Sequence, residues 1–423
     1  MMQPSKAEDG PGAARFGVLA LLFAVYTFNF LDRQVLGILA APIKAELHLT
    51  DTQLGLLGGI AFALFYSGLG IPIAWLADRK SRTWIITAAF ALWSAFTAAC
   101  GLATSFAQLF LLRMGVGVGE AGGVAPSYSL IADYFPPKER ARAFAAYSFG
   151  IPVGSALGVL LGGVFASLIN WRAAFIVVGT AGLLLAPIFR WLVREPPRGR
   201  YDVQRQEKPA GFLTTLSVLG RKPSFWLMSL GAASSSIINY GSFFWIPSFL
   251  VRSYHLPIRE VSYYFAAILF IGGVAGIWLG GFLGDRLGAR SRSVYALIPA
   301  GGFLLAIPGS VLGMLSPSLT AAFFFFLIPT ALGLAWLGPV ITAQQHLVAP
   351  HMRATASAIY LFVINLIGLG LGTVLIGALS DALTRQFGTE ALRYSIVAGS
   401  VFYLIAAIFL LIAARFLPKD WHV

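Results

Sequence analysis

Residues 74–82 of the sequence read AWLADRKSR, and residues 281–290 read GFLGDRLGAR. Each stretch ends an apolar run and carries an Asp-Arg pair at the same place. A second match follows, because Pro126, Pro137 and Arg140 have the same spacing as Pro339, Pro350 and Arg353. The chain therefore consists of two similar halves in the same orientation. Parallel repeats of this kind are typical of membrane transporters.

The composition indicates an integral membrane protein. Hydrophobic residues make up 58% of the 423 residues, charged residues 11%, and the mean hydropathy is +0.79. A soluble domain has roughly 25% charged residues. In a soluble protein, the net charge of +13 would suggest a nucleic-acid partner. Sorting of Lys and Arg by membrane side explains the charge more simply. We therefore expect no nucleic-acid partner. The single Cys100 excludes disulfides and zinc clusters.

Twelve apolar runs are long enough to cross a bilayer, which takes about 18 residues or more. We expect an all-α integral membrane fold of two pseudo-symmetric six-helix bundles, residues 1–197 and 222–423, joined by a basic linker at 198–221. The predicted helices cover 16–43, 52–75, 84–104, 106–135, 141–168, 173–192, 225–251, 260–283, 293–315, 319–347, 353–379 and 392–416.

Lys and Arg gather in the even-numbered loops and the linker. By the positive-inside rule, both termini and the linker are predicted to be cytoplasmic. We expect a multi-pass monomer in the lipid bilayer of the cell (inner or plasma) membrane. Residues 212–219 of the linker could form a short helix on the membrane surface.

Four charges lie inside the predicted helices of the first half. Asp32 and Arg33 are in the run 16–43, and Arg113 and Glu120 are in the run 106–135. Each charge costs roughly 2.5–3.5 kcal/mol at a helix centre unless it faces protein or water. The depths of the two helices place Asp32 between Arg113 and Glu120. The alternative is a buried ion pair that only locks two helices.

The four charges suggest separate roles. Burial favours a neutral carboxyl group and a nearby Arg favours the ionised form, so Asp32 and Glu120 are candidate proton-coupling residues. Arg side chains stay charged and suit an anionic substrate group, so Arg33 and Arg113 are candidate substrate-binding residues. Asn29 shares a helix face with Arg33 and is included in that set.

The second half offers aromatic and amide side chains in place of charges. Candidate substrate-binding residues in it are Asn239, Tyr240, Phe243, Tyr360 and Asn365. One charged wall and one aromatic-amide wall would suit an amphipathic molecule. Ordinary core packing is the alternative for these side chains.

The repeated Asp-Arg stretches resemble the signature loop of the major facilitator superfamily. The 281–290 copy fits that pattern well, whereas the 74–82 copy has Ala74 and Ser81 in the glycine positions. The Arg113…Gly117 spacing also resembles a motif of that family. The resemblance implies a conformational latch at the cytoplasmic side, in which Asp78 faces Arg353 and Asp285 faces Arg142. The latch residues are Asp78, Arg79, Arg142, Asp285, Arg286 and Arg353, and the alternative is that these charges only set the topology.

The sequence NFLDRQ at 29–34, with RMGVGVGEA at 113–121 and ADYFPPKER at 132–140, resembles the spinster-like branch of this family. That resemblance implies proton-coupled export of sphingolipids or lysophospholipids, with Asp32, Arg33, Arg113 and Glu120 matching the functional charges. The anion:cation symporter branch, which moves sugar acids with protons, has a similar arrangement of charges.

The main hypothesis is therefore a proton-coupled secondary active transporter of an amphipathic, lipid-like substrate that works by alternating access. A proton-coupled symporter of a small organic anion such as a sugar acid is the first alternative. A non-transporting receptor or regulatory subunit is the second. We expect no enzyme activity, no metal and no cofactor, with the proton gradient as the energy source.

Overall fold

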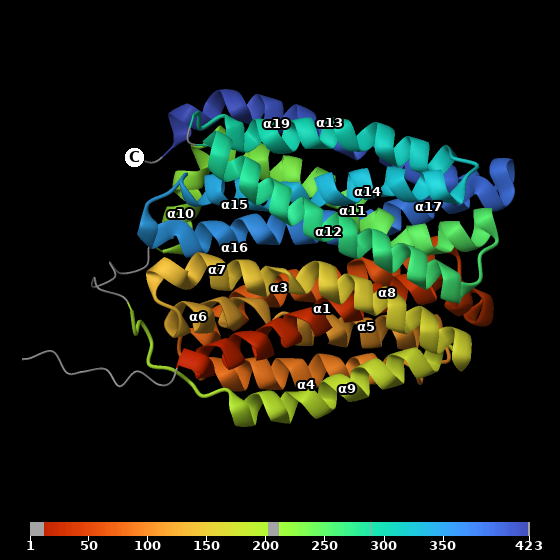
Figure 1. The fold of residues 1–423 in the computed structure, drawn as a ribbon, viewed down its shortest axis with the longest axis horizontal. Helices are drawn as coiled ribbons and strands as arrows, with labels where there is room; N and C mark the ends of the chain where they lie inside the picture. The colour runs from red at the N-terminus through yellow and green to blue at the C-terminus, as the bar shows by residue number, and fades with distance from the viewer. Residues whose placement is uncertain (1–11, 202–210, 289, 422–423) are drawn as a thin grey trace, which may run out of the picture.

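The computed structural model describes residues 12–201, 211–288 and 290–421, which form helices and no strand within those ranges. The helices run along the long axis of one bundle (Figure 1). The first half, red to yellow, lies beside the second half, green to blue. The predicted all-α fold with two six-helix halves is confirmed.

Six segments of the first half cross the bundle, and three of them are interrupted. The second crossing breaks at Gly59, the fourth at residues 121–123 and the fifth at Phe149, where the sequence predicted continuous helices. The elements are α1 (Gly12–Leu47), α2 (Asp51–Gly58), α3 (Ile60–Ala77), α4 (Arg82–Cys100), α5 (Phe106–Glu120), α6 (Val124–Tyr134), α7 (Pro137–Ser148), α8 (Gly150–Leu168) and α9 (Trp171–Leu192).

The second half begins with the short linker helix α10 (Phe212–Gly220), which packs on α11 and α16. The eleventh crossing of the whole chain contains a π-helical turn, Asn365–Leu369, between α16 and α17. The other elements are α11 (Pro223–Tyr254), α12 (Ile258–Gly288), α13 (Val294–Leu315), α14 (Leu319–Ala335), α15 (Leu337–Gln345), α16 (Arg353–Ile364), α17 (Gly370–Phe387), α18 (Ala391–Gly399) and α19 (Val401–Asp420), with single 3₁₀ turns at Pro350–Met352 and Gly388–Glu390.

Length and hydropathy alone select nine candidate spans among the described residues, fewer than the twelve crossings. One of the nine, residues 355–420, contains two crossings. The fourth crossing is missed because α5 and α6 are each shorter than 18 residues. The remaining crossing is α11, a helix of 32 residues that carries several serines and an asparagine.

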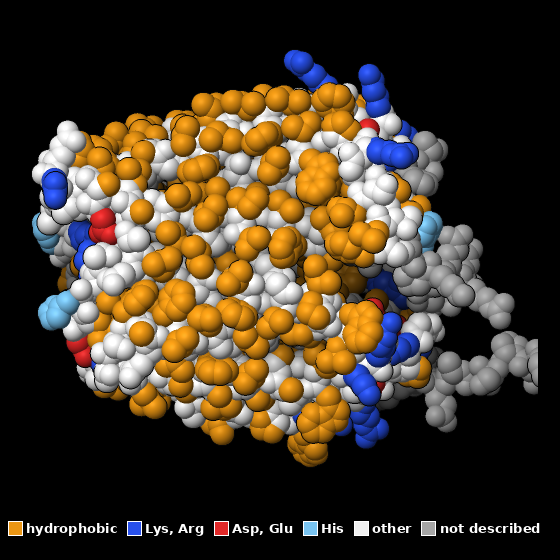
Figure 2. Space-filling view, turned by 180° about the vertical axis from the view of Figure 1, so that it is seen from behind, with side chains coloured by type: hydrophobic (Ala, Val, Ile, Leu, Met, Phe, Trp, Pro, Cys, Tyr) orange, Lys and Arg blue, Asp and Glu red, His pale blue; other side chains and the backbone are white. Residues whose placement is uncertain are grey.

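The surface of the bundle is apolar around its middle and charged at its ends (Figure 2). Exposed Leu, Ile, Phe and Trp side chains form a broad band over the helices, while blue Lys and Arg side chains gather mainly at one end. That end holds the first turn of α1 and the last turn of α19, and we call it the terminal end. The opposite end is called the far end.

The two halves meet where α8 packs on α12, where α1 packs on α11, and where α2 and α3 pack on the eleventh crossing. A Cβ atom on Gly37 would lie 3.2 Å from the Phe244 Cα atom, so α1 and α11 approach closely. At the far end the Thr373 hydroxyl donates to the Gly55 carbonyl at 2.7 Å. At the terminal end, α7 packs on α1, α6 and α8 of its own half.

Candidate functional site

Glu120, the last residue of α5, is fully buried and is bonded to α1. One of its carboxylate oxygens, Oε2, accepts hydrogen bonds from Asn29 Nδ2 at 2.7 Å and from Arg33 Nε at 3.0 Å. Asn29 and Arg33 are one turn apart on α1, so both reach the same carboxylate. The sequence grouped Asn29 with Arg33 but did not identify Glu120 as their shared partner.

The Arg33 guanidinium lies in a box of aromatic rings. Its Cζ atom is 5.0 Å from the Phe30 ring centroid, 4.9 Å from that of Phe62 and 4.5 Å from that of Tyr66. The Arg33 side chain is 9% exposed. Cation–π contacts of this kind contribute roughly 0.5–2 kcal/mol each, more when they are shielded from water. Arg33 is therefore held by one ion pair and three rings.

Asp32 and Arg113 are also buried but have fewer hydrogen-bond partners than Glu120. The Thr97 hydroxyl donates to Asp32 Oδ2 at 3.2 Å, whereas Asp32 Oδ1 has no hydrogen-bond partner among the described residues. Arg113 is 2% exposed and its Cζ atom lies 5.5 Å from the Phe62 ring centroid. Its Nε and Nη1 atoms also have no partner in the described part of the chain. A buried charge without a bonded partner is costly, which makes Arg113 ready to accept an anion.

Glycines allow the helices around this site to approach closely. A Cβ atom on Gly117 would lie 2.5 Å from the Phe62 carbonyl oxygen, and one on Gly119 would lie 2.6 Å from the Trp93 backbone nitrogen. A side chain at either position would push α5 away from α3 or α4. Gly117 thus lets α5 approach α3, where Arg113 lies near the Phe62 ring, and Gly119 lets α5 approach α4.

The candidate residues of the second half are in different environments. Asn239 donates to the Gly333 carbonyl at 3.1 Å and accepts from the Tyr403 hydroxyl at 2.7 Å, so it is bonded within its own half. Tyr240 packs against the aromatic cluster of the first half that contains Phe62.

The remaining three candidates lie on α11 and along the eleventh crossing. Phe243 is half-buried. Tyr360 is buried, and its hydroxyl has no partner among the described residues. Asn365 begins the π-helical turn and is half-buried. Of the second-half set, Tyr240 is therefore the side chain that the structure brings to the charged wall.

In the described part of the chain, no hydrogen bond or ion pair joins one of the six latch residues to another. Asp78, Arg79, Asp285, Arg286 and Arg142 are exposed at the terminal end. Arg353 is half-buried, and its Nε atom donates to the Gln345 carbonyl at 3.0 Å. The latch therefore stays a prediction for a state in which the terminal end is closed.

A second cluster of charges at the terminal end was not predicted. Arg82 is 1% exposed and donates to Asp133 at 2.5 Å and to Glu195 at 2.7 Å. Partial burial alone would raise the pKa of the Glu195 carboxyl, but hydrogen bonds from Thr83, Arg82 and Ser81 outweigh it and hold that pKa below its usual range. The cluster fixes the start of the linker to the loop after α3. Arg82 ends the repeated stretch at 74–82, so the sequence contained a signal for it.

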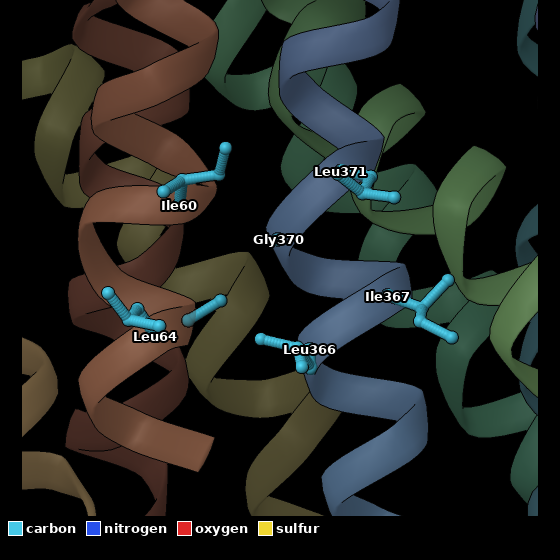
Figure 3. Close-up of a pocket in the computed structure, with 7 residues that line it drawn as sticks. Ile60, Leu64, Leu366, Ile367, Gly370 and Leu371 are labelled. Atoms are coloured by element: carbon cyan, nitrogen blue, oxygen red, sulfur yellow. The ribbon is translucent and has the colours of Figure 1, made fainter. Parts of the chain in front are cut away.

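Two apolar hollows lie between the halves, away from the charges. One, of about 280 Å³, separates α3 from the eleventh crossing and is lined by Ile60, Ala63, Leu64, Leu366, Ile367, Gly370 and Leu371 (Figure 3). The other, of about 380 Å³, lies between α8 and α12 and includes Leu157 and Phe270. Their linings are hydrocarbon, so they suit acyl chains better than charged groups.

Comparison with known proteins agrees with this architecture. Residues 22–369 match the family model of the Major Facilitator Superfamily. An MFS-type efflux pump of Mycolicibacterium smegmatis is 34% identical over 98% of each chain. Human protein spinster homolog 1 is 29% identical over 88% of this chain and 74% of its own. A crystal structure of a bacterial homolog to the human lysosomal transporter Spinster, in an inward-facing and unoccupied conformation, is 36% identical and covers 98% of this chain and 100% of its own, with a TM-score of 0.88.

Two six-helix halves around a buried cluster of charges define a membrane transporter, and the chain belongs to the major facilitator superfamily. Within that family it is a spinster-like transporter and not an enzyme. The predicted family, fold and multi-pass membrane character are thereby confirmed. The alternative of a non-transporting receptor or subunit finds no support in these relatives.

Proposed function

We propose that the chain is a proton-coupled transporter of an amphipathic, lipid-like substrate, a sphingolipid or lysophospholipid, and that it works by alternating access with both termini in the cytoplasm. The observation that carries this proposal is the division of the charges around Glu120. Glu120 holds Arg33 and Asn29, whereas Arg113 lies buried beside them with two unbonded nitrogen atoms.

The charge balance of the cluster links proton and substrate. With Asp32, Arg33, Arg113 and Glu120 all ionised, the cluster is neutral. A proton on Glu120 weakens the charge-assisted bond from Arg33, because a neutral carboxyl is a poorer acceptor. The cluster then carries one excess positive charge, which an anionic head group near Arg113 would balance. Proton occupancy and substrate occupancy are coupled through this shared site.

The shape of the surroundings supports an amphipathic substrate. The charged wall belongs to α1 and α5, while Tyr240 on α11 packs against the aromatic residues beside it. The hollows between the halves are lined by hydrocarbon on both sides of the bundle. A lipid with one charged head and one chain would match both kinds of surface.

Flux into proteoliposomes under an imposed pH gradient tests this function. We expect a labelled lysophospholipid to move with the gradient in the wild-type protein. Asp32→Asn and Glu120→Gln should lose the response to the gradient, because neither side chain can release a proton at accessible pH. A labelled sugar acid in a parallel arm tests the small-anion alternative.

The matched control is Glu46→Gln, a carboxylate at the far end that pairs with Arg172 within the first half. It should respond to the gradient like the wild type. Flux that ignores the gradient in the wild type, or a gradient response that survives in both Asp32→Asn and Glu120→Gln, would refute the coupling. Transport of the sugar acid alone would reverse the ranking of substrates.

A further inference from the structure

An arginine and two tryptophans lie on the outer surface of the first half, where α4 packs on α9. Both helices are on the side of that half away from the second half (Figure 1). Trp84, in the first turn of α4, is 57% exposed, and Trp191, near the end of α9, is 83% exposed. The Arg190 Cζ atom lies 4.6 Å from the centroid of the Trp84 ring. Arg190 and Trp84 thus connect the two helices at the terminal end.

These three side chains are at the depth where lipid head groups begin. The candidate span 82–100 starts two residues before Trp84, and the span 171–192 ends two residues after Arg190. Tryptophan and arginine are common at this depth, because each joins an apolar part to a polar tip. Further along the same helices the exposed side chains are hydrocarbon, and they include Leu92, Leu184 and Ile188. A lipid here would therefore have its chains on hydrocarbon and its head beside Arg190.

The Arg190 guanidinium has unused capacity to donate hydrogen bonds. Its Nε atom is shielded from water and has no hydrogen-bond partner among the described residues. The acid nearest to it in sequence, Glu195, already accepts from Arg82, from the Ser81 hydroxyl and from the Thr83 backbone nitrogen. The next basic residue, Arg194, is exposed and adds a second positive charge. This surface is therefore positive and open to an anion.

Other arginines stacked on tryptophan rings in this protein have bonded partners. Arg79 lies over Trp75 and donates to the Trp75 carbonyl oxygen at 3.0 Å. Arg172 lies over Trp171 and pairs with the Glu46 carboxylate. Arg190 differs from both, because no described side chain or carbonyl takes its hydrogen bonds. Stacking on a ring fixes the plane of the guanidinium, and a planar arginine can donate two parallel bonds to a phosphate.

We propose that Trp84, Arg190 and Trp191 form a binding site for an anionic phospholipid in the leaflet at the terminal end, and we call these residues the lipid-head site. The lipid phosphate accepts hydrogen bonds from Arg190, and the two indole rings flank the head group. Basic surfaces beside transmembrane helices recognise anionic lipids in this way. A zwitterionic lipid would bring its own cation close to Arg190 and Arg194, so the site favours a head group with net negative charge.

The lipid-head site is separate from the central charges of the proposed function. It lies on the outer face of α4 and α9, whereas Glu120 and Arg33 join α5 to α1. Three residues after the span that holds Arg190, Glu195 bonds Arg82 at the start of α4. A lipid that bridges Arg190 and Trp84 would therefore strengthen the junction at which the linker begins.

Native mass spectrometry of the purified full-length protein tests the lipid-head site. The protein in detergent would receive equal amounts of phosphatidylglycerol and phosphatidylcholine with the same acyl chains, and the ratio of the two single-lipid complexes would be measured. We expect the wild type to favour phosphatidylglycerol. Arg190→Ala should lower that ratio by about five- to tenfold, since a hydrogen bond to a charged group contributes roughly that much. Arg190→Lys should keep part of the preference.

Trp191→Leu provides a second variant, and its exposed position makes a folding defect a poor explanation for any change. It should lower retention of phosphatidylglycerol. The matched control is Arg415→Ala, which removes an exposed arginine near the end of α19, also at the terminal end. It should leave the ratio within about twofold of the wild type, and so should Arg113→Ala, which removes a charge of the central site.

An unchanged ratio in both Arg190→Ala and Trp191→Leu would overturn the lipid-head site. An equal loss in Arg415→Ala would mean attraction by overall charge, and an equal loss in Arg113→Ala would place the lipid in the central site. Inorganic phosphate at the lipid concentration should not displace the lipid, and displacement would indicate a site for free anions instead. Lipid retention needs no transport, so failure of the flux assay would leave this result unaffected.

Discussion

At the scale of single residues, two arginines of one site differ in how firmly they are held. Arg33 has an ion pair with Glu120 and three aromatic rings around its guanidinium. Arg113 has one ring nearby, and two of its nitrogen atoms have no hydrogen-bond partner in the described residues. Arg33 is thus part of the scaffold until its partner is protonated, whereas Arg113 is available to an anion.

Replacing each arginine by lysine separates these roles. Arg33→Lys keeps the charge but loses the planar group that bonds Glu120 and stacks on the rings, so we expect a loss of about 1–2 kcal/mol in the free energy of unfolding. Arg113→Lys should cost less than half of that but should weaken binding of the anionic head group more. Thermal unfolding in detergent, with and without lysophospholipid, measures both effects. Equal losses of stability in the two variants would contradict this division.

At the scale of helices, the sequence predicted the crossings but not their breaks. The apolar runs located all twelve segments, and Arg113 and Glu120 both lie on α5, within the predicted run 106–135. That Glu120 binds α1 depends on which helices are neighbours, which spacing along one chain does not reveal. The pairing of Arg252 with Asp51, which belongs to the other half of the chain, is hidden from sequence spacing for the same reason.

Gly117 tests the contact between helices on which the site depends. Gly117→Ala places a methyl group against the Phe62 carbonyl and should force α5 away from α3, at a cost of about 1–3 kcal/mol. Gly301 on α13 is the matched control, because a Cβ atom there meets nothing within 4 Å. Gly301→Ala should stabilise the helix by up to about 1 kcal/mol. Unfolding temperatures and flux report both; if Gly117→Ala matched the control, this account of the packing would be wrong.

At the scale of the whole molecule, alternating access would involve two states, one closed at the far end and one closed at the terminal end. The charged residues at each end would stabilise the state in which that end is closed. At the far end, Asp51 of the first half forms ion pairs with Lys44 and with Arg252 of the second half. At the terminal end, the latch carboxylates of Asp78 and Asp285 are exposed. Closing the terminal end would exchange one set of charge contacts for the other. The difference in free energy between the two sets of contacts would then determine the populations of the two states.

Asp78→Asn tests the other side of this balance. If the Asp78 carboxylate stabilises the start of α16 in the terminal-closed state, its loss should favour the state described here. A carboxylate at a helix N-terminus contributes about 0.3–1 kcal/mol, so we expect a roughly two- to fivefold shift in the ratio of states. The distance between spin labels at Lys138→Cys and Ser291→Cys, in a Cys100→Ala background, measures the shift, and an unchanged distance would count against the latch.

Combining Asp51→Asn with Asp78→Asn makes the comparison quantitative. The two residues lie at opposite ends of the bundle and share no partner, so their free-energy effects should add. Asp51→Asn weakens the pair with Arg252 across the two halves and should favour opening of the far end, whereas Asp78→Asn should favour the state described here. The double variant should therefore lie between them, with a change in the ratio of states equal to the product of the two single changes. A double variant that matched either single variant would mean that one end alone controls the state, and that the two sets of charges do not oppose each other.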